Sequence, residues 1–151
     1  THDLPPTAGY LDGEHVTLRQ KLGILTSDPE EEDANDLEWQ NRVLDTVREH
    51  GDFDGTPADV SYEGLARDER PDSAAIIAGL HKFLAESPAA LTCTSLVDIV
   101  HDRRGQNQPG TTADIYPNWR VPLCDGDGNA VVLEDLFRSD KWAQSYFHSR
   151  R

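Results

Sequence analysis

A predicted helix that leads directly into a long apolar run is the feature that most limits how this chain can fold. Asp72 is a candidate N-cap for a helix over 72–85, and a Ser-Pro pair ends that helix. The next residues, LTCTSLVDIV (91–100), are rich in β-forming side chains, as is typical of a strand covered on both faces. Cys93 lies inside the run and is expected to be a buried thiol. A parallel strand needs partner strands, and the sequence offers only this one long strand. The partner strands are therefore expected upstream of Thr1.

Local signals also predict a long helix over 28–50. Asp28 is suited to cap its first turn, Pro29 can occupy the first helical position, and Gly51 ends it. Apolar spacing and turn residues predict the other elements: helices over 14–25 and 133–147, a loop over 51–71 with one helical turn around 62–66, and a long loop over 101–123.

The charge balance limits the possible partners. Fourteen Lys and Arg face 28 Asp and Glu, which gives a formal charge of -14. This charge would repel phosphate backbones and acidic membrane surfaces, so neither nucleic acid nor a membrane is expected as a partner. The sequence has no apolar run of 18 residues and no pattern typical of a secretory signal. A cytoplasmic protein is therefore the expectation.

Two His-Asp pairs, His2-Asp3 and His101-Asp102, carry groups that can exchange protons or hold a metal. Metal-dependent phosphohydrolases use such a pair on a helix. Pro5 and Pro6 after the first pair, and Arg104-Gly105 after the second, argue against a helix at either place. The stretch DGDGN (125–129) lacks the later ligands of a calcium loop, and a polar turn is predicted there instead. No metal site is expected.

Three stretches, THDLPPTAGYLDGEH, LHKFLAESPAALTCTSLVDIV and NQPGTTADIYPNWRVPL, resemble the C-terminal part of the 4-α-glucanotransferases called amylomaltases, in glycoside hydrolase family 77 of the α-amylase superfamily. The resemblance implies an α/β fold, the C-terminal portion of a (β/α)8 barrel. It would comprise the end of strand 7, helices, strand 8 at 91–100 and a final helix, and would be mostly helical within this chain. Residues 1–151 would then be part of the catalytic barrel and not an independent domain.

The resemblance also implies a site. In that family, Thr-His-Asp is the last shared active-site motif. Asp3 would therefore be the third carboxylate of the active site, besides the nucleophile and the acid/base. It would favour the distorted sugar ring by accepting hydrogen bonds from the ring's hydroxyls. His2 would bind a neighbouring hydroxyl, and Asn107 and Asn118 would also bind glucan hydroxyls. Tyr116 or Trp119 would stack on a sugar face. Packing of the loop against the barrel rim is the alternative for these four loop residues, and it is favoured for Trp119.

The implied reaction moves α-1,4-glucan segments between maltooligosaccharides by retaining double displacement, without a cofactor. Its nucleophile and acid/base would lie upstream, so the remaining N-terminal part of the same enzyme is an expected partner. The family's commoner pattern has an acidic residue where Ile115 stands, and Asp114 is a candidate to replace it.

The two long predicted helices each carry an apolar stripe that needs a cover. In a fragment these stripes are expected to be exposed, because at least one should pack on the barrel wall. They are Leu37, Val43, Leu44 and Val47 on the first helix, and Ile76, Ile77, Leu80 and Phe83 on the second. The alternative to the enzyme is a free-standing acidic interaction module, with the helix over 28–50 as its main surface.

Overall fold

The computed structural model describes residues 3–51, 53 and 60–139, and these form a mostly helical chain. Within the described residues there is no strand, and the one β-type contact is an isolated antiparallel bridge between Cys124 and Ala130. The elements, in chain order, are α1 (Thr7–Leu11), α2 (Glu14–Lys21), α3 (Pro29–His50), a 3-10 turn η1 (Arg67–Glu69), α4 (Ser73–Ala85), α5 (Leu96–Ile99) and α6 (Leu133–Arg138). None of the helices described is both long and apolar enough to cross a membrane.

Helix α3 confirms the prediction over 28–50 in its bounds and in its caps. The Asp28 carboxylate accepts hydrogen bonds from the backbone N–H groups of Glu30 (3.0 Å) and Glu31 (3.1 Å), which satisfies two donors that a helix start leaves open. Gly51 ends the helix in a left-handed conformation with φ of 93°, which glycine adopts without steric cost. The local sequence is therefore sufficient to place this helix.

Helix α4 confirms the prediction over 72–85 in its bounds, but the Asp72 side chain makes no capping hydrogen bond. Helix α2 is shorter than the predicted 14–25, because Leu22 already ends it and Gly23 follows with a φ of 69°. The helical turn predicted around 62–66 is wrong. A bond from Leu65 N to the Tyr62 carbonyl (3.1 Å) closes a non-helical turn there, with Gly64 at a φ of 75°. Of the helix predicted over 133–147, α6 ends at Arg138 and Ser139 is extended, with φ of -83° and ψ of 150°. Residues 140–147 lie outside the described residues.

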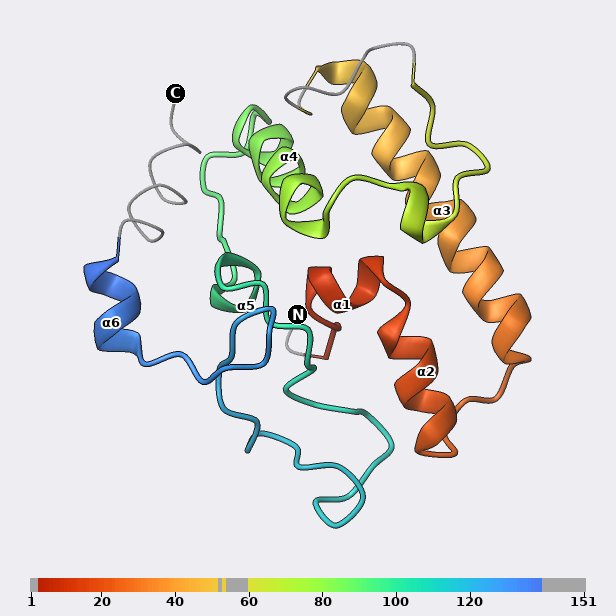
Figure 1. Cartoon of the computed structure of the whole chain (residues 1–151), viewed down its shortest axis with the longest axis vertical. Coiled ribbons are helices and arrows are strands. Elements are labelled where there is room, and N and C mark those ends of the chain that lie inside the picture. The colour runs from red at the N-terminus through yellow and green to blue at the C-terminus, as the bar shows by residue number, and fades with distance from the viewer. Residues whose placement is uncertain (1–2, 52, 54–59, 140–151) are drawn as a thin grey trace.

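The core lies where α1, α3 and α4 meet, as Figure 1 shows with α1 (red) and α4 (green) beside the long α3 (orange). Leu44 and Val47 of the α3 stripe pack here against the α4 stripe, and Leu37 and Val43 are partly buried outside the cluster, so the expectation that the stripes would be exposed is wrong. Tyr62 closes the cluster, with its ring centroid 5.8 Å from that of Phe53. The buried members are Ala8, Leu11, Leu44, Val47, Phe53, Tyr62, Ile76 and Ile77, with Leu65, Leu80 and Phe83 packed against them.

The strand predicted over 91–100 is wrong for this chain. Residues 91–95 have no regular secondary structure, and Leu91 is 92% exposed. Cys93 is exposed too, contrary to the predicted buried thiol. The following residues form the helical turn α5, closed by a bond from Val100 N to the Leu96 carbonyl (3.2 Å). A strand forms only against a partner, and the described residues offer none, so a local helical turn forms at the apolar end of the run.

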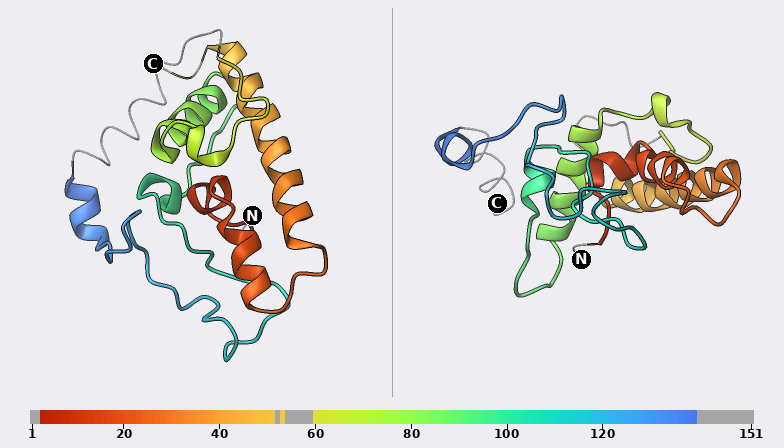
Figure 2. Two further views of the ribbon diagram at one scale, coloured as in Figure 1. Left: turned by 45° about the vertical axis from the view of Figure 1, so that its right-hand side comes forward. Right: turned by 90° about the horizontal axis from the view of Figure 1, so that it is seen from below.

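The N-terminal helices and the C-terminal segment are in direct contact. An ideal Cβ on Gly9 would lie 2.4 Å from the carbonyl oxygen of Arg103, a distance that only a glycine permits. The Arg103 side chain then reaches Glu14, with its Nε 2.8 Å from Oε1. Helix α6 (blue) lies on the opposite side of the molecule from α3 in both views of Figure 2. The contact at Gly9 brings the first residues of the chain beside the long loop that follows α5.

Candidate active site

Asp3 stands on a short stiff segment that leads into α1. Pro6 is the residue before the helix, with φ of -56° and ψ of 145°, and α1 begins at Thr7. Two consecutive prolines keep this segment out of a helix, as the sequence predicts. Asp3 is exposed at the start of the segment. His2 lies outside the described residues.

The structure brings Asp3 together with a second residue of the predicted site. The side-chain amide of Asn107 donates a hydrogen bond to Asp3 Oδ1 at 2.7 Å, across 104 residues of sequence. A carboxylate held by an amide donor keeps a fixed direction and still has lone pairs for another donor. Asp3 and Asn107 therefore form an oriented acceptor at the surface.

The other predicted site residues lie on the same loop as Asn107 but are arranged differently. The Asn118 amide is used inside the loop, because its oxygen accepts from Gln108 N (2.7 Å) and its nitrogen donates to Thr111 Oγ1 (2.9 Å). Trp119 is 60% exposed and has a positive φ of 61°. Its backbone N–H is bound to the Gln106 carbonyl at 2.8 Å. The loop thus holds an exposed indole in an unusual backbone conformation.

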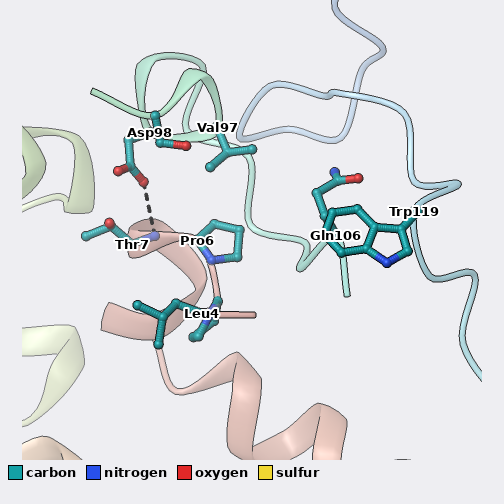
Figure 3. Close-up of a pocket in the computed structure, with 9 residues that line it drawn as sticks. Leu4, Pro6, Thr7, Val97, Asp98, Gln106 and Trp119 are labelled. Carbon is teal, nitrogen blue, oxygen red and sulfur yellow. Dashed lines mark hydrogen bonds between the residues drawn. The ribbon is translucent and has the colours of Figure 1, made fainter. Parts of the chain in front are cut away.

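A cavity of about 300 Å³ lies between the Asp3 segment and this loop. Figure 3 shows Leu4 and Pro6 on one side of it and the indole of Trp119 on the other. Apolar surfaces that face each other with a few polar groups between them are typical of a small-molecule site. The lining residues are Leu4, Pro5, Pro6, Thr7, Ser95, Val97, Asp98, Gln106 and Trp119.

Asp98 joins this cavity to the start of α1. Its Oδ1 accepts a hydrogen bond from the Thr7 backbone N–H at 3.1 Å, drawn as the dashed line in Figure 3. Its Oδ2 lies 3.8 Å from His81 Nε2 of α4. Burial raises the pKa of the Asp98 carboxyl, but the nearby His81 ring and the hydrogen bond from Thr7 outweigh burial and hold the pKa below its ordinary value. Sequence reasoning missed Asp98, although a charged residue inside an apolar run was a signal.

In the second His-Asp pair, the carboxylate of Asp102 has a structural role. Asp102 is 1% exposed and accepts from the backbone N–H of the buried Cys124 at 2.8 Å. It also accepts from Arg104, through the backbone N–H at 3.0 Å and Nε at 3.3 Å. His101 has a φ of 60°, so the pair is not helical. These bonds occupy both carboxylate oxygens and connect the start of the loop to residues beyond its end.

We expect Asp102→Ala to destabilise the protein by roughly 2–3 kcal/mol, because it leaves the buried Cys124 N–H without an acceptor. The midpoint of thermal unfolding should fall, and differential scanning fluorimetry would measure it. Asp127→Ala, in the exposed turn after Cys124, is the matched control and should leave the midpoint unchanged. Equal midpoints for Asp102→Ala and the unsubstituted protein would contradict this role.

Comparison with known proteins identifies the family. Residues 1–125 match the glycoside hydrolase family 77 model, which describes 4-alpha-glucanotransferases. The chain belongs to this family. Membership favours the enzyme over the free-standing interaction module, and it agrees with the resemblance that begins at the Thr-His-Asp motif.

Individual relatives and one solved structure agree with the family match. The chain is 46% identical, over 138 residues, to the 4-alpha-glucanotransferases of Mycobacterium bovis and Mycobacterium tuberculosis, which covers 91% of this chain and 17% of theirs. It also matches the crystal structure of amylomaltase from Corynebacterium glutamicum with a TM-score of 0.90 and 50% identity, over 100% of this chain and 21% of that one. The chain thus spans about a fifth of the length of these relatives.

Proposed function

We propose that this chain forms one wall of the active site of a 4-α-glucanotransferase, which transfers α-1,4-glucan segments between maltooligosaccharides. The observation that carries the proposal is the hydrogen bond from Asn107 to Asp3. This bond orients the carboxylate of the Thr-His-Asp motif at the surface. Family membership supports the reaction class. In the complete enzyme, partner strands from the rest of the barrel would pair with the exposed segment 91–95, ahead of α5.

The chemistry of the reaction explains what an oriented carboxylate contributes. Retaining transfer passes through a flattened, positively charged sugar ring, and it needs a nucleophilic carboxylate and a second carboxyl as acid/base. We assign both of these to the rest of the enzyme. Asp3 accepts hydrogen bonds from hydroxyls of the distorted ring, and bonds that strengthen in the transition state raise the rate. Asn107 restricts the directions that the Asp3 carboxylate can take.

Further substrate contacts are proposed for His2 and Trp119. His2 donates to a neighbouring hydroxyl. Trp119 offers an exposed indole face to a sugar ring, a contact suited to the apolar C–H face of glucose. The Asn118 amide is bound to Gln108 and Thr111. We therefore assign Asn118 an indirect role, in which it holds the shape of the loop that carries Asn107 and Trp119. The proposed reaction uses no cofactor.

Incubation with maltotriose tests the proposed function. The enzyme that contains this chain should release glucose and form maltooligosaccharides longer than the substrate, as chromatography of the products would show. Hydrolysis alone would give glucose and maltose without longer products. Longer products would support a transferase, whereas hydrolysis alone, or no reaction, would contradict the proposal.

A further inference from the structure

Two contacts from the C-terminal half of the chain hold the segment that carries Asp3. Asn107 binds the Asp3 side chain at 2.7 Å, and Asp98 binds the backbone N–H of Thr7 at 3.1 Å. The only residues between Asp3 and Thr7 are Leu4, Pro5 and Pro6. Since proline fixes φ, this link has little freedom of its own. The position of Thr7 therefore largely sets the position of the Asp3 backbone.

Asp98 is itself held firmly. Its side chain is 14% exposed, and Oδ2 faces His81 Nε2 at 3.8 Å. His81 belongs to α4, which packs into the core through Ile76 and Ile77. The contacts thus run from the core through His81 and Asp98 to the first turn of α1. The hydrogen bond from Thr7 and the contact with His81 both limit the directions that the Asp98 carboxylate can take before substrate arrives.

We propose that Asp98 is a positioning residue for Asp3, acting through the Thr7 N–H and the Pro5-Pro6 link. This inference rests on the proposed function, because it assigns to Asp98 the placement of the carboxylate that acts on the sugar ring. Asp98 also lines the cavity beside Leu4 and Trp119, so its loss would free the wall of the site as well as the Asp3 segment.

Steady-state kinetics with maltotriose separate positioning from mere stability. Misplacing a reacting group by about 1 Å can cost about 100-fold, so Asp98→Ala should lower kcat by about 10- to 100-fold and change KM less than about threefold. Asp98→Asn keeps an oxygen acceptor for Thr7 and should retain kcat within about threefold. The matched control is Asp45→Ala, which removes another carboxylate that accepts a backbone N–H, from Tyr62 at 2.8 Å. Asp45→Ala should lower the thermal midpoint and leave kcat unchanged.

A double variant tests whether Asp98 acts through Asp3. If it does, Asp98→Ala should lower kcat by less than about threefold when Asp3 is already asparagine, because coupled residues are not additive. The inference is overturned if Asp98→Ala has the same effect in both backgrounds, or if Asp45→Ala lowers kcat as much as Asp98→Ala does.

Hydrogen exchange gives a readout that does not depend on activity. In the enzyme that contains this chain, backbone amides of residues 3–11 should exchange faster in Asp98→Ala than in the unsubstituted enzyme, and should be unchanged in Asp45→Ala. Unchanged exchange in Asp98→Ala would overturn the inference even if the enzyme transfers glucan. Faster exchange in an enzyme that does not act on maltotriose would support the placement role, while the proposed function would fail.

Discussion

Replacing Asp3 with asparagine should lower kcat for maltotriose disproportionation by roughly 1,000-fold or more, about 4 kcal/mol of transition-state stabilisation. Asparagine has nearly the same shape and can still meet Asn107, but it lacks the negative charge that favours a positively charged sugar ring. KM should change far less, because the interaction strengthens only in the transition state. Release of glucose from maltotriose, measured in the enzyme that contains this chain, gives both constants.

The same isosteric change at an exposed position serves as the control. Asp127→Asn lies in the turn after Cys124 and should leave kcat as it is. If Asp3→Asn keeps more than about a tenth of the kcat of the unsubstituted enzyme, the stabilising role given to Asp3 is wrong.

The 151 residues purified alone should not transfer glucan segments at all. We assign the nucleophile and the acid/base to the rest of the enzyme, and without them Asp3 has no glycosyl-enzyme intermediate to act on. The chain alone should also bind a hydrophobic dye or associate with itself. Its large exposed apolar side chains include Leu4, Leu84, Leu91, Ile115, Trp119, Val132 and Phe137.

Activity assays, dye fluorescence and analytical ultracentrifugation would measure these outcomes on one preparation. Mixing the chain with the remaining part of the enzyme is the positive control, and transfer should appear on mixing. Transfer by the chain alone would contradict the assignment of the two missing groups. A cooperative, monomeric, dye-negative chain would contradict the view that it belongs to a larger catalytic domain.

The sequence was most informative where structure depends on neighbours along the chain. The bounds of helix α3 could be predicted because Asp28 and Pro29 mark its first turn and Gly51 ends it. Each of these residues acts on backbone groups close to it in the chain. The run at 91–100 was misread because its composition is suited to a strand, yet strand formation depends on a partner that composition does not describe. The same apolar residues close a helical turn when no partner is present.

The candidate site could be predicted only in part, for the same reason. The Thr-His-Asp motif indicated Asp3, and the loop motif indicated Asn107, but no local pattern indicates that the two side chains meet. Asp98 was missed altogether, since its importance comes from Thr7, 91 residues away. The apolar positions Leu44, Val47, Ile76 and Ile77 are buried, as the helical spacing predicts. Which elements cover them could not be predicted before the packing of the helices was known.

The two bonds that hold the Asp3 segment have a consequence for the order of folding. They join residues 91 and 104 positions apart, and closing such long loops costs entropy before any contact compensates it. The contacts between α3 and α4 close shorter loops and bury the apolar cluster, so they can form early. The site is therefore completed late in folding, and a nascent chain acquires it only after residues up to Asn107 have been synthesised.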